Sequence, residues 1–174
     1  TDDAAATAFT DDGAELWSTS LPSAVDAMSC STDVLAGLAV DGDTEAWNSD
    51  RLMVLDMGDG TELSDVAAIA PGVQLAYGVA VFGRDVFAIR DGLVTRLAIS
   101  SDSAEVVWTA DFGPWPGIAD DPGSLHGVLV DGDSLVLVGG ARDDGSFRQG
   151  AKAMAVADGA LASAEDEVTD PRAP

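Results

Sequence analysis

The stretch Phe9-Thr10-Asp11-Asp12-Gly13-Ala14-Glu15-Leu16-Trp17 decides the predicted fold. It joins an apolar strand end to a tight turn that holds Asp and Gly, and then to a short second segment that ends in Trp. Asp favours turns because its carboxylate bonds nearby backbone N–H groups, and Gly adopts the positive φ that a tight hairpin requires. The stretch therefore predicts a β-hairpin.

The same pattern returns three times along the chain, with an apolar strand, a turn and a second short strand in each copy. The related strings are Val54–Ser64, Ala98–Trp108 and Ala155–Ser163. The four turn positions, Gly13, Gly60, Ala104 and Gly159, are separated by 47, 44 and 55 residues. Such a period is typical of four-stranded sheets repeated around a ring. An insertion at 139–150 accounts for the longest spacing.

Tryptophan closes two of the four copies, at Trp17 and Trp108, and Ser stands at the same place in the other two. A Trp in the second strand of a hairpin offers a large flat surface to a neighbouring sheet. We therefore expect Trp17 and Trp108 to make contacts between sheets. Where Ser replaces Trp, that contact must be weaker or must come from other residues.

Short apolar runs bounded by Gly and Asp fill the rest of the chain. They include 33–40, 51–56, 78–82, 85–89, 93–99, 128–130 and 134–138. No segment keeps the spacing of an amphipathic helix with caps at both ends. The sequence therefore predicts an all-β fold, and the repeat favours a β-propeller over a sandwich.

The hairpin element Asp12–Trp17, together with Leu55-Asp56 and the turn at Gly60, resembles the PQQ-like β-propeller repeat of bacterial extracellular proteins. The resemblance covers nearly the whole chain, although Leu-Asp is clear only at Asp56. It does not carry the activity of quinone enzymes, because their cofactor-binding residues have no match here. A Kelch-like alternative depends on Val138-Gly139-Gly140, which occurs once.

Strands placed outward from the hairpins predict about three and a half four-stranded blades. They comprise a half-blade at 4–19, blades at 22–66, 72–111 and 124–168, and a polar tail at 169–174. A propeller must close, since an open side exposes an unpaired sheet edge. We therefore expect another propeller segment or chain to complete the ring. The alternative is that the strand count is off by two and the chain closes by itself.

The formal net charge of −23 limits the classes of partner. It would repel nucleic acid and anionic lipid surfaces, so neither is expected as a partner. No apolar run approaches the roughly 20 residues that span a bilayer. The charge, the single lysine and the start at Thr1 favour a processed extracytoplasmic protein (secreted, periplasmic or cell-surface). A halophilic origin and a genomic bias toward Asp and Ala are two alternative explanations of the acidity.

Catalytic motifs are scarce. His126 is the only histidine, and it is most simply a residue at the start of a strand. The chain has no Gly-x-Ser-x-Gly elbow, no P-loop and no Cys/His spacing for zinc. Cys30 is the only cysteine, and we expect it to be a small buried residue in a strand. No catalytic or cofactor-binding residue is predicted.

Acidic turns and two tryptophans are the remaining candidates for ligand contact. Asp41, Asp43, Asp131 and Asp133 stand at alternate positions in turns, where carboxylates can bind calcium. Trp47 and Trp115 lie in loops, and the prolines beside Trp115 stiffen its loop. Turn formation, solubility and capping of blade ends are the structural alternatives for these residues.

Two hypotheses of function follow. The first is a non-catalytic propeller module for binding or assembly in an extracytoplasmic or cell-surface protein. The second is a fragment of a propeller enzyme, either a quinone- or calcium-dependent oxidoreductase or a lyase or hydrolase of polysaccharide. The blade repeat without a catalytic constellation favours the first.

Overall fold

The chain forms β-strands joined by turns in the part that the computed structural model describes. That part comprises residues 5–21, 25–39, 51–63, 78–90, 92–101, 103–113, 124–143 and 146–165. No helix occurs in these ranges, and none is therefore present there that could cross a membrane. The all-β prediction is confirmed.

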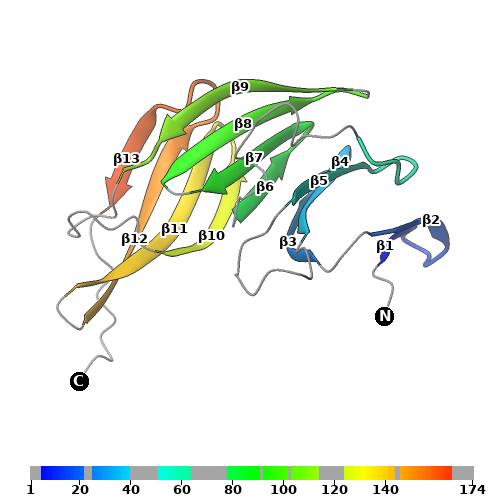
Figure 1. Ribbon diagram of the computed structural model, residues 1–174, viewed down its shortest axis with the longest axis horizontal. Coiled ribbons are helices and arrows are strands. Elements are labelled where there is room, and N and C mark those ends of the chain that lie inside the picture. The colour runs from blue at the N-terminus through cyan, green and yellow to red at the C-terminus, as the bar shows by residue number, and fades with distance from the viewer. Residues whose placement is uncertain are drawn as a thin grey trace. The chain divides into compact units, whose positions relative to one another are not determined.

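The first two sheets come from the first third of the chain (Figure 1). A two-stranded sheet consists of β1 (Ala5–Phe9) and β2 (Glu15–Ser20). A three-stranded sheet consists of β3 (Val25–Cys30), β4 (Val34–Ala39) and β5 (Arg51–Asp56), in that order. An isolated antiparallel bridge joins Leu55 to Glu62, so the chain turns back along β5 after Asp56.

The third and fourth sheets each have four strands. The third contains β6 (Gly78–Phe82), β7 (Asp85–Arg90), β8 (Leu93–Ile99) and β9 (Ala104–Asp111). The fourth contains β10 (Ser124–Asp131), β11 (Ser134–Asp143), β12 (Ser146–Ala155) and β13 (Leu161–Glu165). Strands that are neighbours in sequence are neighbours in the sheet, as Figure 1 shows for β10 to β13. This meander is the strand order of a propeller blade.

The insertion at 139–150 lengthens a hairpin. Strands β11 and β12 continue through it in register, with Gly139 opposite Gly150 and Asp143 opposite Ser146. The extra residues therefore extend two strands of the fourth sheet and leave the order of its strands unchanged.

The chain divides into two compact units, Thr1–Arg90 with Thr95–Val107 and Asp91–Val94 with Trp108–Pro174. In the first unit, one apolar core joins the second and third sheets. It contains Val34, Ala36, Leu38, Leu52, Val54, Leu63, Val79, Val86, Ala88, Leu97, Ile99 and Ala104. In the second unit, Leu135 and Leu137 of β11 and Met154 of β12 are fully buried.

The prediction that Cys30 is buried is wrong. Cys30 is the last residue of β3, and its side chain is exposed. The residue opposite it in the register is Leu35, which is only partly buried. The apolar core takes its β4 side chains from Val34, Ala36 and Leu38, the alternate positions of the strand. Strand alternation therefore gives Cys30 no place in that core.

Candidate functional site: the contacts between sheets

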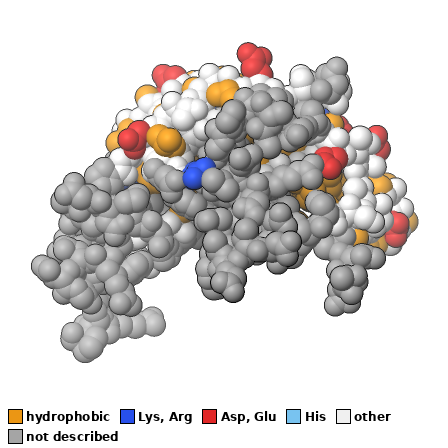
Figure 2. Space-filling model, viewed as in Figure 1, with side chains coloured by type: hydrophobic (Ala, Val, Ile, Leu, Met, Phe, Trp, Pro, Cys, Tyr) orange, Lys and Arg blue, Asp and Glu red, His pale blue; other side chains and the backbone are white. Residues whose placement is uncertain are grey.

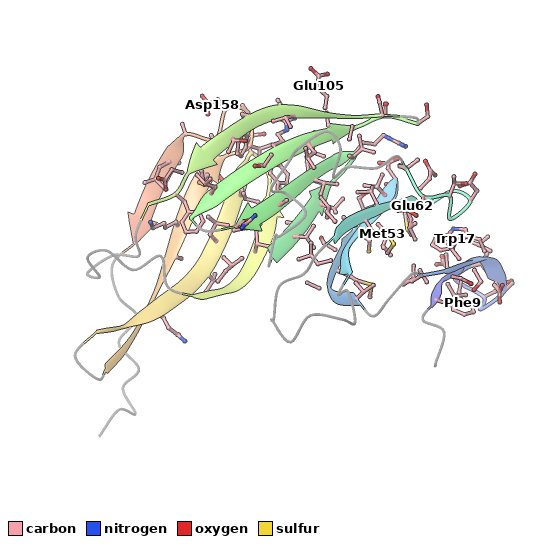
Figure 3. All side chains as sticks on the ribbon, viewed as in Figure 1. Phe9, Trp17, Met53, Glu62, Glu105 and Asp158 are labelled. Atoms are coloured by element: carbon pink, nitrogen blue, oxygen red, sulfur yellow. The ribbon has the colours of Figure 1, made fainter. Side chains whose placement is uncertain are left out.

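Trp17 joins the first sheet to the second. Its indole N–H donates a hydrogen bond to the carbonyl of Met57, at 2.9 Å, and only 9% of the residue is exposed. The hydroxyl of Thr19, two residues along β2, donates to the carbonyl of Gly60 at 2.7 Å. Trp17 also packs with Met53 and Leu55 of β5 (Figure 3 labels Trp17 and Met53). One face of β2 is therefore fixed to the turn that follows β5.

Gly60 makes this approach possible. Its φ is +72°, a conformation that residues with a Cβ rarely adopt. A Cβ at this position would lie 2.5 Å from Cε3 of Trp17 and 2.6 Å from Oγ1 of Thr19. Both the turn and the indole ring therefore require a residue without a side chain.

The second unit repeats this contact with equivalent residues. The indole N–H of Trp108 in β9 donates to the carbonyl of Val156 at 3.0 Å. Gly159 has a φ of +74°, and a Cβ there would lie 2.8 Å from Cε3 of Trp108. Each contact thus combines a Trp of one sheet with two residues in the turn that follows the third strand of the next sheet. The first residue supplies the carbonyl, and the glycine lies three residues beyond it.

Aspartates shape the two turns that receive the indole rings. Asp59 accepts a hydrogen bond from the backbone N–H of Thr61 at 2.9 Å, and this bond holds the pKa of the carboxyl below its usual range. Asp158 accepts one from Ala160 at 3.0 Å. Asp56, at the end of β5, accepts one from Gly58 at 2.8 Å. These carboxylates therefore act as turn acceptors.

No Trp stands between the second and third sheets within the residues that the structure describes, and Arg84 supplies a link there. Its Nε donates to the carbonyl of Ile99 at 3.0 Å, and one of its Nη atoms lies 3.3 Å from a carboxylate oxygen of Asp56. Ser31 adds a hydrogen bond from its hydroxyl to the carbonyl of Gly83 at 2.6 Å. The contacts of Arg84 with Asp56 and of Ser31 with Gly83 thus join the second and third sheets.

Lys152 in β12 is a buried cation of the second unit, with 4% of the residue exposed. Its ammonium group donates to the carbonyls of Phe112 and Gly113, the latter at 2.9 Å, and lies 5.4 Å from the centre of the Phe112 ring. Burial lowers the pKa of Lys152, and the nearby carboxylate of Asp111 acts in the opposite direction. Lys152 therefore fixes the end of β9 to the fourth sheet.

The predicted calcium ligands are only partly within the described residues. Asp131 and Asp133 are exposed and flank Gly132, which has a φ of +57°, in the turn between β10 and β11. Asp41 and Asp43 lie outside the described residues. Among the residues that are described, no three His, Cys, Asp or Glu side chains come together as a metal site would require.

The two loop tryptophans predicted as contact residues, Trp47 and Trp115, also lie outside the described residues. His126 is within β10. Acidic side chains are scattered over the described part of the face shown in Figure 2 and do not gather in one patch. The contacts between sheets are therefore the best-defined constellation that the structure offers.

Comparisons with known proteins support the architecture. No family model matches the sequence, and no curated protein sequence matches it. Among solved structures, the chain is similar to the crystal structure of BamB from Moraxella catarrhalis, with a TM-score of 0.55 and 15% sequence identity. The chain has a β-propeller fold. The similarity covers 88% of this chain and 41% of the BamB chain, so this chain spans less than half the length of that propeller.

Proposed function

We propose that this chain is a non-catalytic β-propeller module that serves binding or assembly, and that a further propeller segment completes its ring. The observation that carries the proposal is the first sheet, which has two strands among the described residues where the third and fourth have four. A sheet of two strands lacks two of the strands of a complete blade, and its open edge can pair with added strands. The 41% coverage of the BamB chain supports the same proposal.

The blade boundaries belong to this proposal. The proposed half-blade is 4–19, and the proposed blades are 22–66, 72–111 and 124–168. The order of the four sheets along the chain supports these bounds, with β2 ending one residue later, at Ser20. Membership of the PQQ-like repeat family is a further part of it. The repeated contact of an indole ring with the glycine of an Asp-containing turn, at Trp17 and Trp108, supports that assignment.

An extracytoplasmic location is also part of the proposal, and the net charge of −23 with a single lysine supports it. Two further predictions belong to the proposal. The first is calcium binding at the acidic turns of Asp41, Asp43, Asp131 and Asp133. The second is ligand contact at Trp47 and Trp115. Isothermal titration of the purified chain with calcium tests the first. Binding assays with Trp47→Ala and Trp115→Ala variants test the second.

The native mass of the particle that contains this chain tests the central proposal. Multi-angle light scattering and mass spectrometry of the native complex should give a mass well above 17.7 kDa, with a second propeller-like segment in it. A monodisperse particle of 17.7 kDa with a closed ring would contradict the proposal. Substrate turnover by the assembled particle, lost on changing His126, would contradict the non-catalytic assignment.

A further inference from the structure

The two Trp contacts show which strands of a blade the first sheet contains. Trp17 lies in β2 and Trp108 in β9, and each ring packs on the equivalent glycine of the next sheet. Thr10 and Ser100, which start the two turns, are also equivalent. The backbone N–H of Thr10 donates to the carbonyl of Ala14, and that of Ser100 donates to the carbonyl of Ser103. Strands β1 and β2 therefore correspond to β8 and β9, the third and fourth strands of the complete sheet.

In that complete sheet, the strand beside β8 is the most deeply buried. Val86, Phe87 and Ile89 of β7 are 0% exposed, and Ala88 is 4% exposed. In the second strand of the fourth sheet, Leu135 and Leu137 of β11 are 0% exposed, and the apolar residues Val136 and Val138 alternate with them on a less buried face. A strand in this position is apolar on both faces, since apolar side chains cover the sheet on each side.

The corresponding edge of β1 has no strand on it within the described part of the chain. Strand β1 pairs only with β2, from Ala5 opposite Ser20 to Phe9 opposite Glu15. An unpaired edge presents alternate N–H and C=O groups, and proteins usually protect such edges with Lys, Pro or a bulge that turns the edge away. The sequence of β1, Ala-Ala-Thr-Ala-Phe, contains neither Lys nor Pro. The register with β2 shifts between Ala8 and Phe9, at the end of the strand, so the edge is regular from Ala5 to Ala8. Phe9 is 61% exposed at the end of this strand (Figure 3).

The charges near the end of β1 indicate which side chain would suit the turn of a hairpin that pairs with this edge. In the third sheet, Arg84 of the β6–β7 turn donates to the carbonyl of Ile99, at the end of β8. Phe9 is the equivalent of Ile99, and the acidic residues Asp11 and Asp12 follow it, both exposed. Residues 5–20 contain no Lys or Arg. A basic residue in the added turn would therefore meet uncompensated carboxylates.

We propose that the outer edge of β1 binds an antiparallel β-hairpin from the propeller segment that completes the ring. The hairpin strand that pairs with β1 is apolar at about four consecutive positions, as in β7, and its turn carries an Arg or Lys that reaches Asp11 and Asp12. The inference rests on the proposed function, because it names the place and the chemistry of the partner that completes the ring.

A peptide from the chain itself tests this edge. Residues 78–90 include β6, the Arg84 turn and β7, and they carry a net charge of about +1 from the side-chain charges at neutral pH. The full chain, labelled with ¹⁵N, is mixed with this peptide, and amide hydrogen exchange is followed by NMR. We expect exchange at Ala5–Phe9 to slow by at least about tenfold at saturating peptide, because the edge amides become hydrogen-bonded.

Two matched peptides separate the causes of binding. Peptide 78–90 with N-methyl groups along the β7 backbone keeps every side chain but loses donors for a ladder, so it should give no protection. Peptide 78–90 with Arg84→Glu keeps the ladder but places an acid beside Asp11 and Asp12. It should bind at least about tenfold more weakly at low salt, with the difference reduced at 1 M salt.

Other outcomes would overturn the inference. Unchanged exchange at Ala5–Phe9 with millimolar peptide would contradict it, as would protection confined to another strand edge such as that of β13. Protection of β1 that grows with protein concentration and without peptide would show that a second copy of the chain covers the edge. A large native particle would still support the proposed function in these cases, so the two failures can be told apart.

Discussion

Trp17 and Gly60 share one contact, in which a Cβ placed on Gly60 would lie 2.5 Å from Cε3 of the indole ring. The same ring is oriented by its N–H bond to the carbonyl of Met57. Trp108 and Gly159 repeat the arrangement in the second unit, with a distance of 2.8 Å. Because the indole ring can lie where it does only when residue 60 has no side chain, substitutions at these two positions test the contact between the first and second sheets directly.

Gly60→Ala should destabilise the chain more than Gly13→Ala does. Gly13 has a φ of +84° and nothing within 4 Å of the position of a Cβ, so its substitution carries only the cost of the left-handed conformation, about 1 kcal/mol. At Gly60 the overlap with Trp17 adds about 1–3 kcal/mol. Urea unfolding followed by tryptophan fluorescence measures both, and equal costs at the two glycines would contradict the close contact.

Trp17→Ala and Gly60→Ala should be strongly coupled. Without the indole ring, a Cβ at position 60 loses its closest contact, although Oγ1 of Thr19 still lies 2.6 Å away. The double variant should therefore be more stable than the sum of the single effects by about 0.5–3 kcal/mol. A cycle that combines Gly60→Ala with Trp108→Ala is the control. The second ring contacts Gly159, so that pair should be additive within about 0.5 kcal/mol. Additivity in the first cycle would show that Trp17 and Gly60 do not meet.

The propeller fold could be predicted from the sequence because it depends on local signals that repeat. Turns at Gly13, Gly60 and Gly159 require a positive φ, and that requirement is visible in the residue type itself. The spacing of these turns then separates a propeller from a sandwich.

The partners of the key side chains could not be predicted in the same way. Met57 accepts the hydrogen bond of Trp17 through its backbone carbonyl, a group that every residue has. Arg84 takes part in the contact of the second and third sheets from a turn that has no place in the repeat. Lys152 is buried although lysine is rarely buried, and the carbonyls of Phe112 and Gly113, which accept its hydrogen bonds, come from a distant part of the sequence.

Arg84→Met should destabilise the first unit by about 1–2 kcal/mol. The ion pair with Asp56 contributes at most about 1 kcal/mol, because the two side chains are 37% and 28% exposed. The hydrogen bond from Nε to the carbonyl of Ile99 contributes about 1 kcal/mol. Arg84→Lys is the matched variant, which keeps the charge but lacks the Nε donor.

Salt separates the two contributions of Arg84. The difference in the free energy of unfolding between Arg84→Lys and Arg84→Met reports the charge, so it should shrink in 1 M salt. The difference between the natural chain and Arg84→Lys reports the geometry of the guanidinium group and should change little. Urea unfolding at low and high salt gives both values. A loss of both differences in salt would assign the whole effect of Arg84 to charge.

The stability of the chain at alkaline pH should depend on Lys152. Burial lowers the pKa of this side chain in the folded state, so the unfolded chain keeps a proton over a range of pH where the folded chain has released it. The contribution of Lys152 to the free energy of unfolding should therefore increase as pH rises from the lowered pKa toward the ordinary value of about 10.4. Below that window the charged form is buried and the penalty is complete.

Lys152→Met isolates this effect because the chain has no other lysine. Methionine keeps the length and apolar character of the side chain but cannot titrate. The difference in the free energy of unfolding between the natural chain and the variant, measured by urea unfolding between about pH 7 and pH 10.4, should shift in favour of the natural chain as pH rises. A shift in the opposite direction would mean that the Asp111 carboxylate outweighs burial and raises the pKa of Lys152. A difference that stays constant would mean that the ammonium group is as well solvated in the folded chain as in the unfolded one.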